Sequence, residues 1–210
     1  SSSITASFSN VQTVYSNDQA FAVLMNDGTV VTWGNASNGG DSSSVSSQLS
    51  SGVIDIKSSE TTFLAIKDDG SYVLWGYLGE KYGGNIPDHL LSSLQEGIKT
   101  IYSNNYAFAA LKKDGSVVTW GDENMGGTSN FLSNLSYGVS EIYSSRGAFA
   151  ALKNDGSVVT WGANLLGGYS NNLNDKLSSG VIEVYSNYYS FAALKENGSV
   201  ITWGTYEFGG

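Results

Sequence analysis

The sequence predicts an all-β fold, a five-bladed β-propeller built from repeats of about 42 residues. Three observations support it. All five tryptophans lie in a Trp-Gly dipeptide, and an Asp-Gly or Asn-Gly pair precedes each of them. The segments that flank this pair carry apolar residues on both alternating faces, which is typical of a small sheet covered on both sides. The tryptophans are Trp33, Trp75, Trp120, Trp161 and Trp203.

A pair of glycines closes every repeat, so the chain divides into units that together form one repeat domain. The units are 1–40, 41–84, 85–127, 128–168 and 169–210. A unit of this size cannot bury a core by itself. Neighbouring units must therefore cover one another's apolar faces.

Each unit is expected to contain three antiparallel strands preceded by a short helix or loop. Asp-Gly and Asn-Gly are the dipeptides that favour a tight hairpin, and a third apolar segment such as 53–57 or 181–185 precedes that hairpin. Before this strand, apolar residues three or four positions apart indicate one or two helical turns. These apolar residues are Val45 and Leu49, Leu90, Leu91 and Leu94, Leu132 and Leu135, and Leu173 and Leu177.

Repeated alanines in the hairpin strands favour closure of the five units into a ring, because small side chains let sheets approach closely near a crowded axis. They are Ala109, Ala110, Ala150, Ala151, Ala192 and Ala193. An open, solenoid-like stack of the same units is the alternative. The ends of such a stack could pair between chains.

Composition argues against catalysis and against several classes of partner. The chain has no cysteine and a single histidine, so it lacks a thiol nucleophile, a thiolate zinc site and a multi-histidine metal centre, and we expect no cofactor. The net charge of −9 disfavours nucleic acid, and no apolar run is long enough for membrane insertion. The sequence therefore indicates a protein that is not an enzyme.

The polar residues that recur in the repeats have structural explanations. Asp27, Asp69, Asp114 and Asp155 lie in the hairpin turns, where turn geometry explains them better than calcium binding or paired catalytic carboxylates. His89 is expected at the surface near the start of a helix. The five tryptophans, each in the same position of its repeat, are predicted to form the core between blades rather than a sugar-binding platform.

The repeat also resembles a known family. The segment from Tyr102 to Gly127, with Asp-Gly-Ser-Val-Val-Thr-Trp-Gly at its centre, is similar to the repeat of the regulator of chromosome condensation (RCC-type) family, and comparable segments occur in every unit. The resemblance implies a β-propeller. The histidine of the family repeat is replaced in all five units, its Gly-Gln-Leu-Gly is shortened to Gly-Gly, and no insertion is long enough for the wedge of the family's exchange factors. No functional residue is therefore carried over, and an exchange factor for a small GTPase is a minority alternative. A weaker, architectural resemblance connects the chain with the five-bladed tachylectin lectins.

Function is expected in two loops that vary between otherwise similar units, one before the hairpin and one after Trp-Gly. We predict a binding or assembly scaffold that recognises a protein or a glycan through these loops. The alternatives are a multivalent lectin and a building block of an extracellular assembly, which would self-associate. Richness in Ser, Asn, Thr and Gly favours an extracellular or cell-surface location over a cytoplasmic one. The candidate ligand-binding residues are Tyr77, Tyr82, Asn104, Tyr106, Arg146, Tyr188, Tyr189 and Tyr206.

Overall fold

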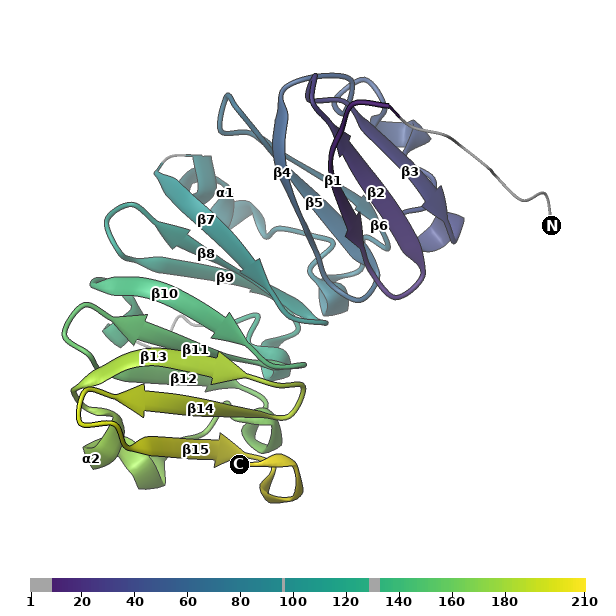
Figure 1. Cartoon of the computed structure of the whole chain (residues 1–210). Helices are drawn as coiled ribbons and strands as arrows, with labels where there is room; N and C mark the ends of the chain where they lie inside the picture. Colours follow the sequence, from purple (N-terminus) through teal and green to yellow (C-terminus); the bar gives the residue numbers. More distant parts are fainter. Residues whose placement is uncertain (1–8, 96, 129–132) are drawn as a thin grey trace.

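The computed structural model describes residues 9–95, 97–128 and 133–210, and in this part of the chain fifteen strands form five three-stranded antiparallel sheets (Figure 1). Each sheet contains three consecutive strands and corresponds to one predicted unit, here called a blade. Blade 1 has β1 (Val11–Ser16), β2 (Ala20–Met25) and β3 (Val30–Gly34); blade 2 has β4 (Val53–Ser58), β5 (Thr62–Lys67) and β6 (Tyr72–Gly76); blade 3 has β7 (Ile98–Ser103), β8 (Ala107–Lys112) and β9 (Val117–Gly121); blade 4 has β10 (Val139–Ser144), β11 (Ala148–Lys153) and β12 (Val158–Gly162); blade 5 has β13 (Val181–Ser186), β14 (Ser190–Lys195) and β15 (Val200–Gly204).

The hairpin turns have the geometry that their sequence predicts. In blade 3 the Asp114 carboxylate accepts hydrogen bonds from the backbone N–H of Ser116, at 2.9 Å, and from its hydroxyl, at 2.6 Å, while Gly115 has a φ of 80°. The same arrangement recurs at Asp27, Asp69, Asp155 and Asn197. These hydrogen bonds lower the pKa of the four aspartates. The interpretation of these residues as structural turns is confirmed.

Short helices occur where the apolar spacing predicts them. They are η2 (Ser43–Val45), α1 (Asp88–Gln95), η5 (Ser133–Leu135), η7 (Asn171–Leu173) and α2 (Asn174–Leu177). Leu49, Leu94, Leu135 and Leu177 from these segments are buried, whereas Leu132 lies outside the described residues. His89 is exposed in the first turn of α1, as expected. Further 3-10 turns follow the Trp-Gly pairs: η1 (Ala36–Asn38), η3 (Glu80–Tyr82), η4 (Glu123–Met125), η6 (Asn164–Leu166) and η8 (Tyr206–Phe208).

The core lies between blades. Among the described residues it falls into four clusters, one at each junction between consecutive blades. We call the face of a blade that covers the preceding blade its front face, and the opposite one its back face. Between blades 3 and 4, for example, Ala109 and Leu111 on the back face of blade 3 contact Phe149, Ala151 and Trp161 on the front face of blade 4.

One Phe–Trp pair anchors every junction. At the junction before blade 4 the Phe149 and Trp161 rings stack with centroids 5.2 Å apart, and the Trp161 indole N–H donates to the carbonyl of Gly126 at 3.1 Å. Gly126 has a φ of 97°, and a Cβ there would lie 2.7 Å from Cδ2 of Phe149. The other tryptophan–glycine bonds between blades are Trp75–Gly39, Trp120–Gly83 and Trp203–Gly167, at 3.1 to 3.2 Å. The prediction that the tryptophans form the core between blades is confirmed for these four.

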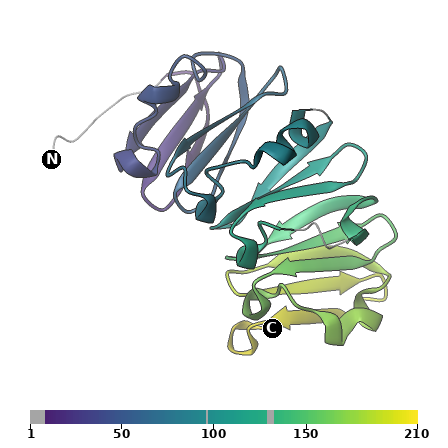
Figure 2. The same ribbon diagram turned by 180° about the vertical axis from the view of Figure 1, so that it is seen from behind.

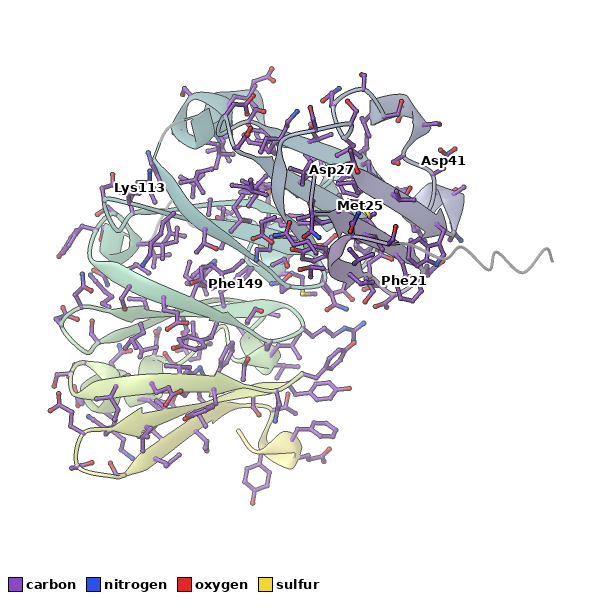
Figure 3. All side chains as sticks on the ribbon, turned by 45° about the horizontal axis from the view of Figure 1, so that its top comes forward. Phe21, Met25, Asp27, Asp41, Lys113 and Phe149 are labelled. Carbon is purple, nitrogen blue, oxygen red and sulfur yellow. The ribbon has the colours of Figure 1, made fainter. Side chains whose placement is uncertain are left out.

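The five blades follow an open arc, with blades 1 and 5 at its opposite ends (Figures 1 and 2). Phe149 lies between two sheets, whereas Phe21 lies on the first sheet at one end of the arc (Figure 3). Phe21 is 44% exposed, while its equivalents in blades 2 to 5 are at most 1% exposed. The five antiparallel blades are as predicted, but in this structure the two end blades do not cover each other as a closed ring would require. Five of the six alanines that favour closure pack instead at the internal junctions, whereas Ala192 in blade 5 is partly exposed.

Candidate binding surface

The two variable loops of each blade lie side by side at one end of the strands. In blade 3 the backbone N–H of Asp122, after Trp-Gly, donates to the carbonyl of Tyr106, before the hairpin, at 3.1 Å. The equivalent bonds are Asn35–Gln19, Tyr77–Thr61, Ala163–Gly147 and Thr205–Tyr189, at 2.9 to 3.2 Å. We call this end of the blades the loop face, and the end that carries the Asp-Gly turns the turn face. All variable positions predicted to bind a ligand therefore belong to the same face.

Asn104, a predicted ligand contact, braces the two loops of its own blade. Its side-chain oxygen accepts from the backbone N–H groups of Tyr106 and Ala107, both at 2.8 Å, and its side-chain nitrogen donates to the carbonyl of Met125 at 2.8 Å. Asn17 and Asn187 make the same contacts in their blades. Asn104 is also only 6% exposed. Because both ends of its amide are engaged, we assign it a structural role and leave it out of the binding surface.

The first variable loops of all five blades surround a hollow of about 440 Å³ on the loop face. Its lining is polar and includes Asp18, Glu60, Asn105, Arg146 and Tyr188. A series of backbone hydrogen bonds joins blades 2 to 5 beside the hollow: Glu60 N–H donates to Asn105, Asn105 to Arg146, and Arg146 to Tyr188, at 2.9 to 3.1 Å. These bonds hold the loops in a fixed order around the hollow.

Arg146 lies between two tyrosines that come from neighbouring blades. Its Nη2 donates to the Tyr106 hydroxyl at 2.8 Å, and its Cζ lies 5.6 Å from the Tyr106 ring centroid and 5.3 Å from that of Tyr188. Both distances are within the range of a cation–π interaction. Its Nε is buried and has no hydrogen-bond partner. Burial and the Glu60 carboxylate raise the pKa of Tyr106, so the hydroxyl that meets Arg146 is neutral at physiological pH.

Further aromatic rings extend this contact on both sides. Tyr77 meets Tyr82 and Tyr82 meets Tyr106, each with centroids 5.7 Å apart. On the other side, Tyr188 lies 4.8 Å from Tyr189, which stacks on Phe208 at 4.3 Å. We call this continuous series across blades 2 to 5 the aromatic ladder. Its members are Tyr77, Tyr82, Tyr106, Arg146, Tyr188, Tyr189 and Phe208.

Six of the eight predicted site residues belong to the aromatic ladder. Tyr206 is 90% exposed on the loop face without a ring contact that joins it to the ladder, and Asn104 is the brace described above. The ladder adds Phe208, which sequence reasoning did not single out although it lies in a variable loop. The sequence of this loop contains no pattern that predicts the stacking of Phe208 on Tyr189. Tyr77, Tyr188 and Phe208 are 47 to 50% exposed, so apolar ring surface is accessible to a partner.

In the described ranges 9–95, 97–128 and 133–210, no three His, Cys, Asp or Glu side chains come together as a metal site would need. No helix among these residues combines the length and the apolar character needed to cross a bilayer.

The fold is similar to that of several solved structures. Human WBSCR16 superposes with a TM-score of 0.61 at 18% identity, over 92% of this chain and 61% of that one. Prp20p from Saccharomyces cerevisiae, yeast RCC1, gives 0.59 at 17% identity, over 92% and 57%. The receptor kinase CR4 ectodomain from Physcomitrella patens gives 0.53 at 14% identity, over 91% and 49%.

The chain thus spans about half to three fifths of the length of these neighbours. By sequence, no protein-family model and no curated protein matches it. At these identities the likeness concerns the fold, and at that level the expected resemblance to RCC-type propellers is confirmed.

Proposed function

We propose that the protein is a non-enzymatic binding module that recognises another protein through its loop face. The observation that carries this proposal is the aromatic ladder. It is continuous across four blades and is built from the residues that distinguish one repeat from another. Tyrosine and arginine are enriched at protein interfaces and dominate their binding energy. A scaffold that keeps its core constant and varies these residues is suited to recognition.

The ladder favours one extended partner over several small ones. A lectin with one sugar site in each blade would repeat the same polar and aromatic set five times. Here the side chain that does repeat, the Asn or Ser at the position of Asn104, is consumed in bracing the loops. The rings of Tyr106 and Tyr188 share a single arginine rather than standing apart as separate platforms. A multivalent lectin is therefore the second candidate.

The solved neighbours are consistent with a protein partner. The work on Prp20p concerns its binding to Gsp1p and histones, and the same yeast protein has been solved with Kap60 bound to it. An exchange-factor activity toward a small GTPase is a minority proposal for the present chain, which spans 57% of Prp20p. An extracellular or cell-surface location also remains a proposal that rests on composition.

The partner class is tested with two probes offered to the same protein: a random-peptide display library and a glycan array. We expect peptides to be selected and to compete with one another for one site. Tyr188→Ala and Arg146→Ala should each weaken the selected peptides about tenfold or more, as expected for residues at the centre of an interface. Titration calorimetry measures the affinities.

The matched control is Tyr137→Ala. Tyr137 is 62% exposed and precedes Gly138, whose N–H group lies beside Gly115 in a hairpin turn, so it belongs to the turn face. It also contacts a cation, Lys153, at 4.2 Å from the ring centroid. The control should bind the peptides as the wild type does. Peptides that lose affinity only with Tyr137→Ala, or specific binding to the glycan array with no peptide selected, would contradict a protein-binding loop face.

A further inference from the structure

The junction between blades 2 and 3 differs from the other three at the turn face. At those three junctions a backbone N–H group at the start of the later blade donates to the carbonyl of the hairpin glycine of the earlier blade. The bonds are Val53–Gly28, Val139–Gly115 and Val181–Gly156, at 3.0 to 3.1 Å. The equivalent residues between blades 2 and 3 are Ile98 and Gly70, and no backbone hydrogen bond joins them. A Cβ at the other three glycines would lie 2.8 Å from the next unit, whereas at Gly70 no described atom lies within 4 Å.

The same two blades are held together at the loop face. The Trp120 indole N–H donates to the carbonyl of Gly83 at 3.2 Å, as at the other junctions. The backbone N–H of Glu60 donates to the carbonyl of Asn105 at 2.9 Å. The separation is therefore confined to the turn ends of the two blades, where α1 lies between them (Figures 1 and 2).

This separation leaves apolar side chains of both blades partly exposed. Ile98 of blade 3 is partly exposed, although its equivalents at the other three junctions are at most 4% exposed: Val53, Val139 and Val181. Ile66, on the back face of blade 2, is partly exposed as well, although its equivalents at those junctions are at most 8% exposed: Leu24, Leu111 and Leu152. The surface that the other junctions bury is accessible only in part buried form here.

Ile66 and Ile98 line a groove of about 320 Å³ between the blades. Tyr72 of blade 2, Leu94 of α1 and Ile101 of β7 complete its apolar lining, and the last two are buried. The volume is about twice that of an apolar cavity that accepts benzene, so the groove has room for an apolar group of about ten non-hydrogen atoms. It is also near the lower end of the pockets that bind small molecules.

The charged residues around the groove favour an anion. Three lysines and two aspartates line it, an excess of positive charge in a chain whose net charge is −9. They are Lys67, Lys99, Lys113, Asp55 and Asp68. Asp55 is already paired with Lys57, at 2.9 Å between Oδ2 and Nζ, whereas none of the three lysines has an ion pair in the described part of the chain.

Lys113 is the cation most available to a ligand. It is exposed at the turn end of blade 3 (Figure 3). Its ammonium group makes no hydrogen bond within the described residues, whereas those of Lys67 and Lys99 donate to backbone carbonyls, at 2.9 Å and 3.2 Å. Its three N–H donors are therefore free to bind a carboxylate.

We propose that this groove is a second binding site, which takes a free small molecule with an apolar body and one carboxylate. The body lies against Ile66, Tyr72 and Ile98, and the carboxylate meets Lys113. Burial of the apolar body supplies affinity, and the lysine fixes its orientation. The site is on the turn face, so it does not depend on recognition of a protein by the loop face.

Titration with sodium octanoate, followed by the backbone amide resonances of the labelled protein, tests the proposal. We expect saturable shifts at residues 66–72, 98–101 and 113, with those of the loop face unchanged. Octan-1-ol has an apolar body of the same length without the charge. It should shift the same amides but bind about three- to tenfold more weakly, because it makes no charge-assisted hydrogen bond.

Two pairs of variants separate the charge from the apolar lining. Lys113→Ala should reduce the affinity for octanoate to that for octanol, whereas Lys176→Ala, which removes an exposed lysine of α2, should not. Ile54→Ser changes a lining residue that is 53% exposed and should weaken both probes. Its matched control is Ile182→Ser, at the equivalent position of blade 5 and also 53% exposed, which should weaken neither.

Several results would overturn the proposal. They are shifts that do not saturate, shifts centred outside the groove, and octanol that binds as tightly as octanoate. The same holds if Lys113→Ala binds octanoate as the wild type does, or if each control variant weakens binding as much as its partner. All four substitutions are at exposed side chains, so an unchanged circular dichroism spectrum is expected and shows that the variants fold.

Discussion

The Phe–Trp pair of blade 1 and the pair of blade 3 have the same rings in the same stack, yet they lie in different surroundings. In blade 3 a neighbouring sheet covers Phe108, which is fully buried, and the Trp120 indole donates to Gly83 of blade 2. In blade 1 Phe21 faces solvent over nearly half of its surface. Local sequence thus determines the stack within a blade, whereas burial comes from the neighbouring blade. This explains why a repeat of this length does not form a core by itself.

Removing the phenylalanine from each pair should produce the largest difference in the free energy of unfolding between the two blades. Phe108→Ala leaves a cavity inside a junction and should lower the free energy of unfolding by about 3 to 5 kcal/mol. Phe21→Ala removes a ring that is already half exposed and should cost about 1 to 2 kcal/mol in dilute solution. Denaturation with urea at low protein concentration measures both.

The order of the two costs is what the comparison predicts. Phe108→Ala should destabilise the fold more than Phe21→Ala, because only Phe108 is enclosed by a neighbouring blade. Equal costs in dilute solution would show that Phe21 is covered within the single chain and would contradict the open arc.

The closing glycines provide a second matched pair. Gly126 and Gly209 have nearly equal φ angles, 97° and 95°, but a Cβ would meet the Phe149 ring at 2.7 Å in one case and only a hydroxyl oxygen at 3.8 Å in the other. Gly209→Ala should therefore cost only the strain of the left-handed conformation, about 1 to 2 kcal/mol. Gly126→Ala should cost about 1 to 3 kcal/mol more, because the ring must move as well.

Thermal unfolding followed by circular dichroism measures this difference. The two variants share the backbone strain, so the difference between their midpoints reports the contact between blades alone. Equal midpoints would mean that the Phe149 ring yields without cost, and the double glycine would then be explained by its φ angle rather than by packing.

Much of the fold could be predicted from the sequence because its signals are local and repeated. Asp-Gly pairs identified the hairpins, Trp-Gly identified the strand that carries the core, and Val45 with Leu49 indicated a helical turn. The choice between a closed ring and an open arrangement could not be made from the sequence, because it depends on the accumulated angles between blades rather than on a local residue pattern. Five of the six alanines that favoured closure pack at the internal junctions of the open arc.

The candidate site was predictable in part, because the loops that form it can be recognised by their variation between repeats. Variable loops identified the loop face, and most members of the aromatic ladder were among the predicted residues. Sequence variation, however, does not show which side chains already form hydrogen bonds within the protein and so are not available to a ligand. Asn104 is used within its own blade, and the contact of Arg146 with Tyr106 and Tyr188 joins residues about 40 positions apart. Contacts between blades depend on how the units pack, so they appear only in three dimensions.

The smallest expected effect is a difference in acid stability between the hairpin turns of blades 3 and 5. Asp114 and Asn197 accept the same two hydrogen bonds, but only Asp114 titrates, and those bonds lower its pKa. A carboxyl group whose pKa is lower in the folded than in the unfolded state stabilises the fold above its unfolded pKa, near 4, and loses this contribution as the pH falls through its folded pKa. The turn of blade 3 should therefore weaken in acid, whereas the turn of blade 5 should not.

Asp114→Asn tests this directly, because it converts the turn of blade 3 into the chemistry already present in blade 5. The variant should fold as the wild type does at neutral pH, and the Asp114 carboxyl resonance, which titrates below an ordinary aspartate, should disappear from the NMR titration. Amide exchange at Ser116 should then no longer accelerate in acid beyond that at Ser199. If Asp114 titrates as a free aspartate in the wild type, its hydrogen bonds to Ser116 contribute nothing in solution, and the two turns do not differ.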